Sequence, residues 1–196
     1  LFPALIIEYW CQWQEEQTRK KQEQKFPLFR LPFPILLVPS GLLLYMNYLS
    51  EHFNDALKFF HAQPAFGADR SSKIILLYQV FFRYFKMVMT VDPGSWLYFR
   101  VTQELLVSGL FLILGILSFR KTRASYATFA LLSFIVPTLT GTFSSMPRYV
   151  LVMFPAFMVL ARWLSPRPNL RRVWYLVSGL LLVVNLTLFL TGRWVA

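Results

Sequence analysis

The residues best suited to chemistry lie in a short stretch that precedes the apolar run 150–160: Ser145, Pro147, Arg148 and Tyr149. An arginine at the mouth of a membrane helix is costly to leave unpaired. It therefore either extends to the lipid headgroups or binds an anion. The stretch predicts a membrane anchor or an anion site at Arg148, and other features of the sequence are needed to distinguish the two.

A second polar stretch covers residues 54–70. Leu57, Phe60 and His61 fall at helical spacing, which predicts a short helix that ends before Pro64. Either this helix rests on lipid, or its polar side chains line an outward cavity that suits a headgroup such as a sugar phosphate. The candidate cavity residues are His61, Gln63, Asp69 and Arg70.

Other chemistry finds little support in the sequence. His52, His61 and Asp55 contain metal-ligand types, but neither spacing matches a helical histidine pair such as i, i+4. We therefore predict no metal site and no cofactor, while a metal requirement stays open. No nucleotide-binding loop or serine-hydrolase elbow is present.

The composition is that of an integral membrane protein. Hydrophobic residues make up 56% of the 196 residues, and the mean hydropathy is +0.49. The net charge of +11 does not indicate nucleic acid as a partner, because the basic residues cluster between apolar runs, as membrane topology requires. The single cysteine, Cys11, excludes an internal disulfide.

Five apolar segments predict an all-α, polytopic bundle of transmembrane helices: 31–49, 97–119, 124–140, 149–164 and 173–190. Three basic connections separate them, around residues 19–30, 120–123 and 162–172. The positive-inside rule places these connections in the cytoplasm. The loops 50–96 and 141–148 and the C-terminus then face outward.

Residues 74–91 form an apolar segment that we do not predict to span. Arg83 and Lys86 lie near its middle, and a crossing here would place the basic cluster 120–123 outside. We expect an interfacial amphipathic helix whose two cations meet headgroups or a phosphate. A turn at Asp92-Pro93-Gly94-Ser95 ends it.

The chain begins with Leu1, inside an apolar stretch of residues 1–10 that is too short to cross a membrane alone. We therefore expect a partial span here, and we expect residues 1–196 to be the C-terminal part of one larger integral-membrane domain. The missing N-terminal part of the same protein is an expected partner.

Two stretches carry a family resemblance. The first is Asp55-Ala56-Leu57-Lys58-Phe59-Phe60-His61-Ala62-Gln63 followed by Phe66-Gly67, and the second is Ser145-Met146-Pro147-Arg148-Tyr149 followed by Phe154-Pro155. Both resemble patterns of the PIG-V-like mannosyltransferases, and Gly192-Arg193-Trp194-Val195-Ala196 resembles the end of their bacterial members. The likeness covers most of residues 31–196.

The resemblance implies a C-type glycosyltransferase that transfers a hexose, such as mannose, from a polyprenyl-phosphate carrier to an acceptor on the outer membrane face. It implies that Arg148 pairs with the carrier phosphate, that Tyr149 and Ser145 add hydrogen bonds, and that Pro147 fixes the approach to the helix. Arg83, with Lys86, would help to hold the carrier. The expected location is a bacterial plasma membrane, with the endoplasmic reticulum membrane as the alternative.

The chain departs from the family in one respect. Members carry an acidic general base in the first outer loop, which would lie upstream of Leu1. We therefore assign no catalytic residue and expect the chain alone to be inactive.

Two other functions stay open. A non-catalytic membrane protein, such as a lipid transporter subunit or a scaffold, would use Arg148 only as an anchor. A channel or proton-coupled carrier would need ionisable groups within spans. The clear candidate is Glu104, which can simply pair with Arg100 at i, i+4.

Overall fold

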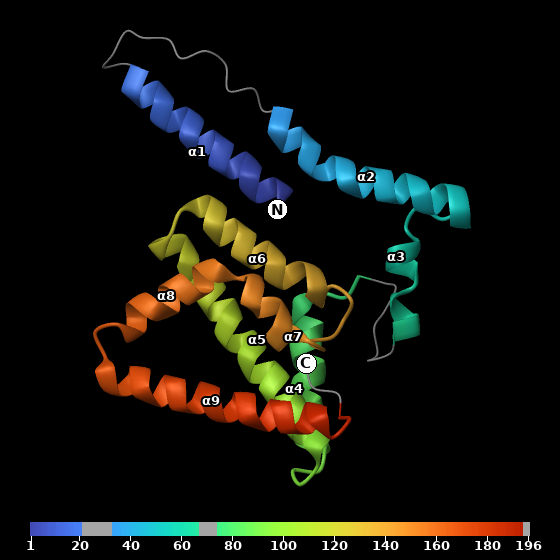
Figure 1. Cartoon of the computed structure of the whole chain (residues 1–196), viewed down its shortest axis with the longest axis vertical. Coiled ribbons are helices and arrows are strands. Elements are labelled where there is room, and N and C mark those ends of the chain that lie inside the picture. Colours follow the sequence, from blue (N-terminus) through green and yellow to red (C-terminus); the bar gives the residue numbers. More distant parts are fainter. Residues whose placement is uncertain (21–32, 67–73, 194–196) are drawn as a thin grey trace.

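A computed structural model describes residues 1–20, 33–66 and 74–193, and every regular element in these ranges is helical. Figure 1 shows their arrangement. In chain order they are α1 (Phe2–Lys20), α2 (Phe33–Phe53), α3 (Lys58–His61), η1 (Gln63–Phe66), α4 (Leu77–Thr90), α5 (Trp96–Lys121), α6 (Ala124–Thr138), α7 (Met146–Tyr149), η2 (Val150–Val152), α8 (Phe154–Leu164) and α9 (Pro168–Leu190). The prediction of an all-α protein is confirmed for the described residues.

Helix α5 is the centre of the fold and packs against α4, α6 and α8. Ser95 begins it, because its hydroxyl accepts a hydrogen bond from the Tyr98 amide at 3.2 Å. Small and polar residues, Ser108, Gly115 and Ser118 among them, form a buried stripe along one face. A side chain added at Gly115 would lie 3.1 Å from Leu131 of α6, so this glycine permits the close approach of the two helices.

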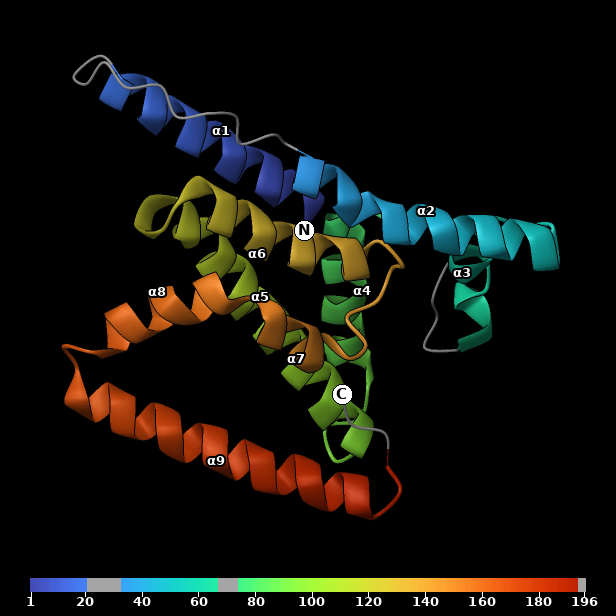
Figure 2. The same ribbon diagram turned by 45° about the horizontal axis from the view of Figure 1, so that its top comes forward.

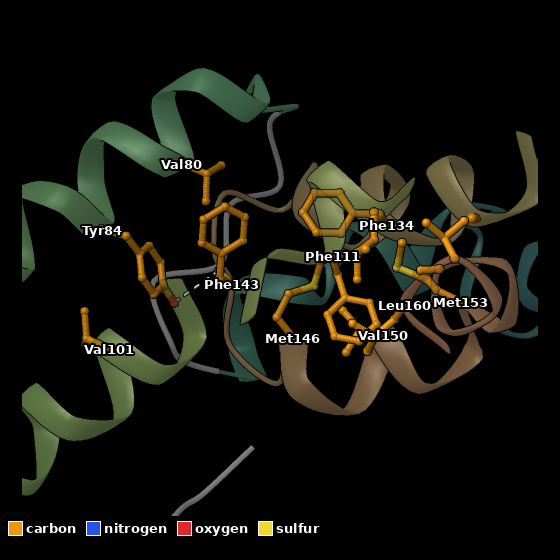
Figure 3. Close-up of a cluster of buried hydrophobic side chains, with 14 of the residues drawn as sticks. Val80, Tyr84, Val101, Phe111, Phe134, Phe143, Met146, Val150, Met153 and Leu160 are labelled. Carbon is orange, nitrogen blue, oxygen red and sulfur yellow. Dashed lines mark hydrogen bonds between the residues drawn. The ribbon is translucent and has the colours of Figure 1, made fainter. Parts of the chain in front are cut away.

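The hydrophobic core lies where α4, α5, α6 and the α7–α8 region meet, and Figure 3 shows it. Phe143 occupies one end, with its ring centroid 4.7 Å from that of Phe81 and 4.9 Å from that of Tyr84. Phe134, Met146 and Met153 are fully buried further along. The loop between α6 and α7 is therefore part of the core, and two side chains of α4 hold its backbone: Arg83 donates to the Gly141 carbonyl, and the Tyr84 hydroxyl accepts from the Phe143 amide.

The predicted span 149–164 differs from the observed element. The chain forms α7 and the 3₁₀ turn η2 and then bends by 85° before α8. Met153 has φ −79° and ψ 55°, and Pro155, which lacks a backbone N–H, lies in the first turn of α8. The helix is interrupted here because the Met153 backbone leaves the helical region, and Pro155 cannot donate a hydrogen bond back to the preceding turn.

Helices α1, α2 and α9 lie around this centre. Glu8 and Arg123 form an ion pair of 3.0 Å between α1 and the turn before α6, and Ser125 also donates to Glu8. Helix α9 has no buried residue and meets the bundle near the α8–α9 turn (Figure 2). Helix α2 exposes Leu42, Leu43 and Leu44.

Two helices in the described ranges are long and apolar enough to cross a membrane, α5 with 26 residues and α9 with 23. A third crossing is available if the bent pair α7–η2 and α8 counts as one. Helix α6 is apolar but has only 15 residues. The chain is thus suited to association with a membrane through two or three spans. The predicted bundle of five spans goes beyond this finding.

The other predicted elements differ mainly at their ends. The helix predicted over 74–91 begins at Leu77, because the Ile75 amide instead donates to the Leu139 carbonyl at 3.0 Å and keeps the chain extended. The short helix before Pro64 is confirmed as α3. The partial span 1–10 is the first half of α1, which continues through the following polar residues to Lys20.

Candidate functional site

A buried polar cluster joins α4, α5 and the loop before α7. The Tyr84 hydroxyl donates to Glu104 Oε2 at 2.8 Å and lies 3.0 Å from Thr142 Oγ1. The same oxygen accepts a hydrogen bond from the Phe143 amide at 3.1 Å, drawn as a dashed line in Figure 3. Burial raises the pKa of the Tyr84 phenol. The phenol thus stays protonated and continues to donate to Glu104.

Glu104 is the buried acid of this cluster, with 1% of its surface exposed. Its Oε1 lies 3.7 Å from Arg100 Nε, the ion pair that the i, i+4 spacing predicts. That distance is too long for a direct hydrogen bond, and both atoms are buried without a hydrogen-bond partner among the described residues. Charge attraction alone therefore links the two side chains. The Glu104 carboxyl group lies on the buried side of Arg100, whose side chain also lines the surface cleft described below.

Ser145 connects the cluster to the predicted Pro-Arg-Tyr stretch. It has φ 67°, a left-handed conformation that is uncommon for residues other than glycine. Its side chain is fully buried, its Oγ has no partner among the described residues, and its backbone amide interacts with Glu104. Such strain persists only where the surroundings enforce it, and it concentrates at functional sites.

Three cations line a cleft of about 560 Å³ on the surface of this cluster. Arg83 and Lys86 come from α4 and Arg100 comes from the first turns of α5, and the cleft floor contains Tyr84 and Thr142. No carboxylate is among its described lining residues. Arginine and lysine donors in a partly shielded cleft form charge-assisted hydrogen bonds with phosphate, so the cleft is suited to a phosphate group.

Gly141 fixes Arg83 at the rim of this cleft. The Arg83 Nη1 donates to the Gly141 carbonyl at 3.1 Å, which leaves most of the guanidinium's five donors for a ligand. Gly141 has φ 89°, and a side chain added there would lie 2.5 Å from Ile75 Cδ1 and 3.3 Å from Arg83 Nη1. Only glycine fits this position.

A second cavity, a groove of about 310 Å³, lies on the other side of the 141–144 loop. Gln63 of η1 and Tyr149 of α7 both line it, so the structure brings together one residue from each predicted polar stretch. The rings of Phe59 and Phe60 also line it, and Thr142 belongs to the linings of both cavities. The two cavities are therefore neighbours.

The remaining predicted site residues lie apart from these cavities or outside the described ranges. Arg148 is exposed and has no hydrogen bond or ion pair to another described residue, and Pro147 follows Met146 in the first turn of α7. His61 pairs with Asp55 at 2.9 Å on the surface. Asp69 and Arg70 lie outside the described residues.

Sequence reasoning did not identify the buried cluster. Tyr84 and Thr142 are 58 positions apart, and neither is unusual for its segment. The available signal was the pair Arg100 and Glu104, since an acid about two turns into a long apolar helix needs a buried partner. Within the described ranges, no group of three His, Cys, Asp or Glu residues could hold a metal ion.

Comparisons of the chain with protein-family models, with curated proteins and with solved structures found no match. The PIG-V-like resemblance therefore stays a prediction based on the quoted residues.

Proposed function

We propose that the chain acts in a membrane glycosyltransferase that takes a hexose from a polyprenyl-phosphate carrier. The observation that supports this best is the convergence of Arg83, Lys86 and Arg100 on one cleft at the surface of α4 and α5. A phosphate diester on a lipid is an anion held at a membrane surface, and such a cleft offers it three cationic donors.

The position of the cleft fits a lipid-linked ligand. Helix α4 presents large apolar side chains beside it, and Phe82 and Met89 are more than two-thirds exposed. Aromatic and aliphatic side chains next to cations are characteristic of helices that lie in the membrane interface. A carrier whose phosphate occupied the cleft would therefore find apolar surface for its hydrocarbon chain.

This proposal assigns the phosphate to Arg83, Lys86 and Arg100, while the family resemblance assigns it to Arg148. The exposed position of Arg148, without a partner, also fits the alternative function, a non-catalytic membrane protein in which this arginine anchors the chain. The two assignments can be separated by substitution.

The test is equilibrium binding of polyprenyl-phosphate mannose to the chain in lipid nanodiscs. Lys86→Gln is the cleanest variant, because Lys86 is exposed and its ammonium has no partner among the described residues, so the substitution breaks no contact of the fold there. We expect affinity to fall about tenfold or more, the effect of losing one charge-assisted hydrogen bond. Arg100→Lys, which keeps the charge but not the planar donor geometry, should weaken binding by a smaller factor.

Arg171→Gln supplies the matched control, since it removes one exposed positive charge at the start of α9, away from the cleft. Arg148→Ala belongs in the same series. If Arg148→Ala lowered the affinity and the cleft variants did not, the phosphate would be assigned to the Pro-Arg-Tyr stretch instead of the cleft. Equal affinity for all of these variants would contradict the transferase proposal and favour the anchoring function.

A further inference from the structure

We infer that the groove between α3–η1 and the α6–α7 region binds a neutral pyranose sugar, beside the anion in the cationic cleft. The inference rests on the proposed function and adds to it a location for the sugar. Its defining residues are Phe59, Phe60, Ser144 and Tyr149.

The chemistry of the lining selects an uncharged polar ligand. The described residues around the groove are aromatic, aliphatic or uncharged polar, in contrast to the three cations of the neighbouring cleft. A pyranose ring has an apolar face of C–H groups and an edge of hydroxyls. Phe59 and Phe60 offer flat apolar surface for the face, and hydroxyl side chains offer partners for the edge.

Two of those hydroxyls are available. Tyr149 Oη and Ser144 Oγ make no hydrogen bond to another described residue, although Ser144 is almost fully buried. The other polar groups are already occupied: Thr140 Oγ1 donates to the Pro137 carbonyl at 2.9 Å, and Thr142 Oγ1 accepts from the Ser144 amide at 3.0 Å. Ser144 lines the groove, and its Oγ is not among the buried unpaired atoms of the described residues, so this hydroxyl is accessible to a ligand and can donate to it or accept from it.

The α3–η1 wall of the groove is stabilised by a hydrogen bond of its own. Gln63 Nε2 donates to the Phe59 carbonyl at 3.0 Å, which ties η1 to α3 and keeps both aromatic residues at the groove. Thr142 connects the groove to the cleft, because its hydroxyl lies between Tyr84 on one side and Ser144 on the other. A sugar and a phosphate bound to the two cavities would be adjacent, as the parts of a glycosyl phosphate are.

The test uses methyl α-D-mannopyranoside, which carries neither phosphate nor lipid, with the whole chain in nanodiscs and saturation-transfer NMR as the readout. We expect Tyr149→Phe and Ser144→Ala each to raise the dissociation constant about fivefold, which corresponds to about 1 kcal/mol for one neutral hydrogen bond. Tyr175→Phe, on the exposed surface of α9, is the matched control and should change nothing. Sorbitol, which has similar hydroxyls but no ring face for Phe59 and Phe60, should bind more weakly than the mannoside.

Polyprenyl phosphate without a sugar is the second probe and separates this inference from the proposed function. We expect Tyr149→Phe to leave its affinity unchanged and Lys86→Gln to weaken it. If Lys86→Gln had no effect while Tyr149→Phe still weakened mannoside binding, the proposed phosphate site would fail and the sugar groove would stand. The groove assignment would be overturned if the mannoside did not bind the unsubstituted chain, or if Tyr149→Phe and Ser144→Ala both bound it as tightly as the unsubstituted chain does.

A final competition identifies the source of the sugar. Displacement of the mannoside by intact polyprenyl-phosphate mannose would place the donor's hexose in the groove. Simultaneous binding of the two would place a hydroxyl-bearing acceptor there. Either result supports a sugar site.

Discussion

Tyr84 is the residue at which three parts of the chain meet. Its hydroxyl contacts Glu104 of α5, the Thr142 side chain and the Phe143 amide, while its ring packs on Phe143 in the core. Because one oxygen serves three neighbours, the residue orders both the cleft floor and the loop that leads to α7. Substitution of Tyr84 should therefore lower the stability of the protein more than substitution of an ordinary core tyrosine.

We expect Tyr84→Phe to destabilise the protein by about 1 to 3 kcal/mol, since the ring still fills the core while a buried carboxyl and a buried amide lose a partner. Thermal unfolding in nanodiscs, followed by tryptophan fluorescence, measures the effect. Tyr78→Phe on the exposed face of the same helix is the control and should change the midpoint little. A Tyr84→Phe midpoint equal to that of the control would show that the hydroxyl network contributes no stability.

The sequence predicted some of these residues and could not predict others. Arg83 and Lys86 were recognised because cations inside an apolar segment are conspicuous. Tyr84 and Thr142 were not, because an aromatic residue in an amphipathic helix and a threonine in a loop are common, and only the tertiary fold brings them within 3.0 Å. The unusual backbone of Ser145 has no signature in composition or spacing either.

At the level of elements, α3 shows how a four-residue helix is held. Helices this short have little intrinsic stability. Asp55 supplies two contacts that favour it: its Oδ1 accepts from the Leu57 amide at 3.0 Å, and its Oδ2 lies 2.9 Å from His61 Nδ1 at the helix end. The hydrogen bond to His61 lowers the pKa of the Asp55 carboxyl.

The lowered pKa of Asp55 determines how the stability of α3 changes with pH. The Asp55 carboxylate stabilises α3 fully above the ordinary aspartate pKa of about 3.9, and this contribution is lost as the pH falls through the lower value of the folded state. We expect the amides of Phe60 and His61 to keep their protection from hydrogen exchange near neutrality and to lose part of it in strong acid. In Asp55→Asn the protection should be weaker at neutrality and should not respond to acid in this way. Unchanged protection in that variant would mean that packing alone holds α3.

Long apolar runs in the sequence predicted where helices lie more accurately than whether each helix is continuous. The helices at 96–121 and 168–190 were predicted within a few residues, because long apolar runs flanked by arginines have few other structures available. The bend before α8 was not predicted. Proline is tolerated inside membrane helices, so Pro155 alone does not separate a kink from a break, and the 3₁₀ turn at 150–152 has no sequence signature.

For the molecule as a whole, the distribution of charge sets an expected orientation. Arg120, Lys121 and Arg123 lie between α5 and α6, while the other end of α5 carries the Asp92–Ser95 turn. The positive-inside rule places the first end in the cytoplasm and the second outside, and the cationic cleft lies near the second.

Cysteine labelling of intact cells tests this orientation. In a Cys11→Ser background, Gly94→Cys should react with a membrane-impermeant maleimide in intact cells, and Ala124→Cys should react only after permeabilisation. Both positions are exposed, so burial does not confuse the result. The opposite pattern would reverse the orientation, and labelling of both positions in intact cells would mean that α5 does not cross.

The unequal lengths of α5 and α6 have a consequence for the surrounding lipid. At about 1.5 Å per residue, the 26 residues of α5 extend about 39 Å and the 15 residues of α6 about 22 Å. Helix α5 is therefore longer, and α6 shorter, than the bilayer's hydrocarbon thickness of about 30 Å. Where both helices cross side by side, α5 has to tilt and the bilayer next to α6 has to thin. The acyl-chain length of the host membrane then acts on the two helices in opposite directions: shorter-chain lipids reduce the mismatch at α6 and increase the tilt that α5 needs.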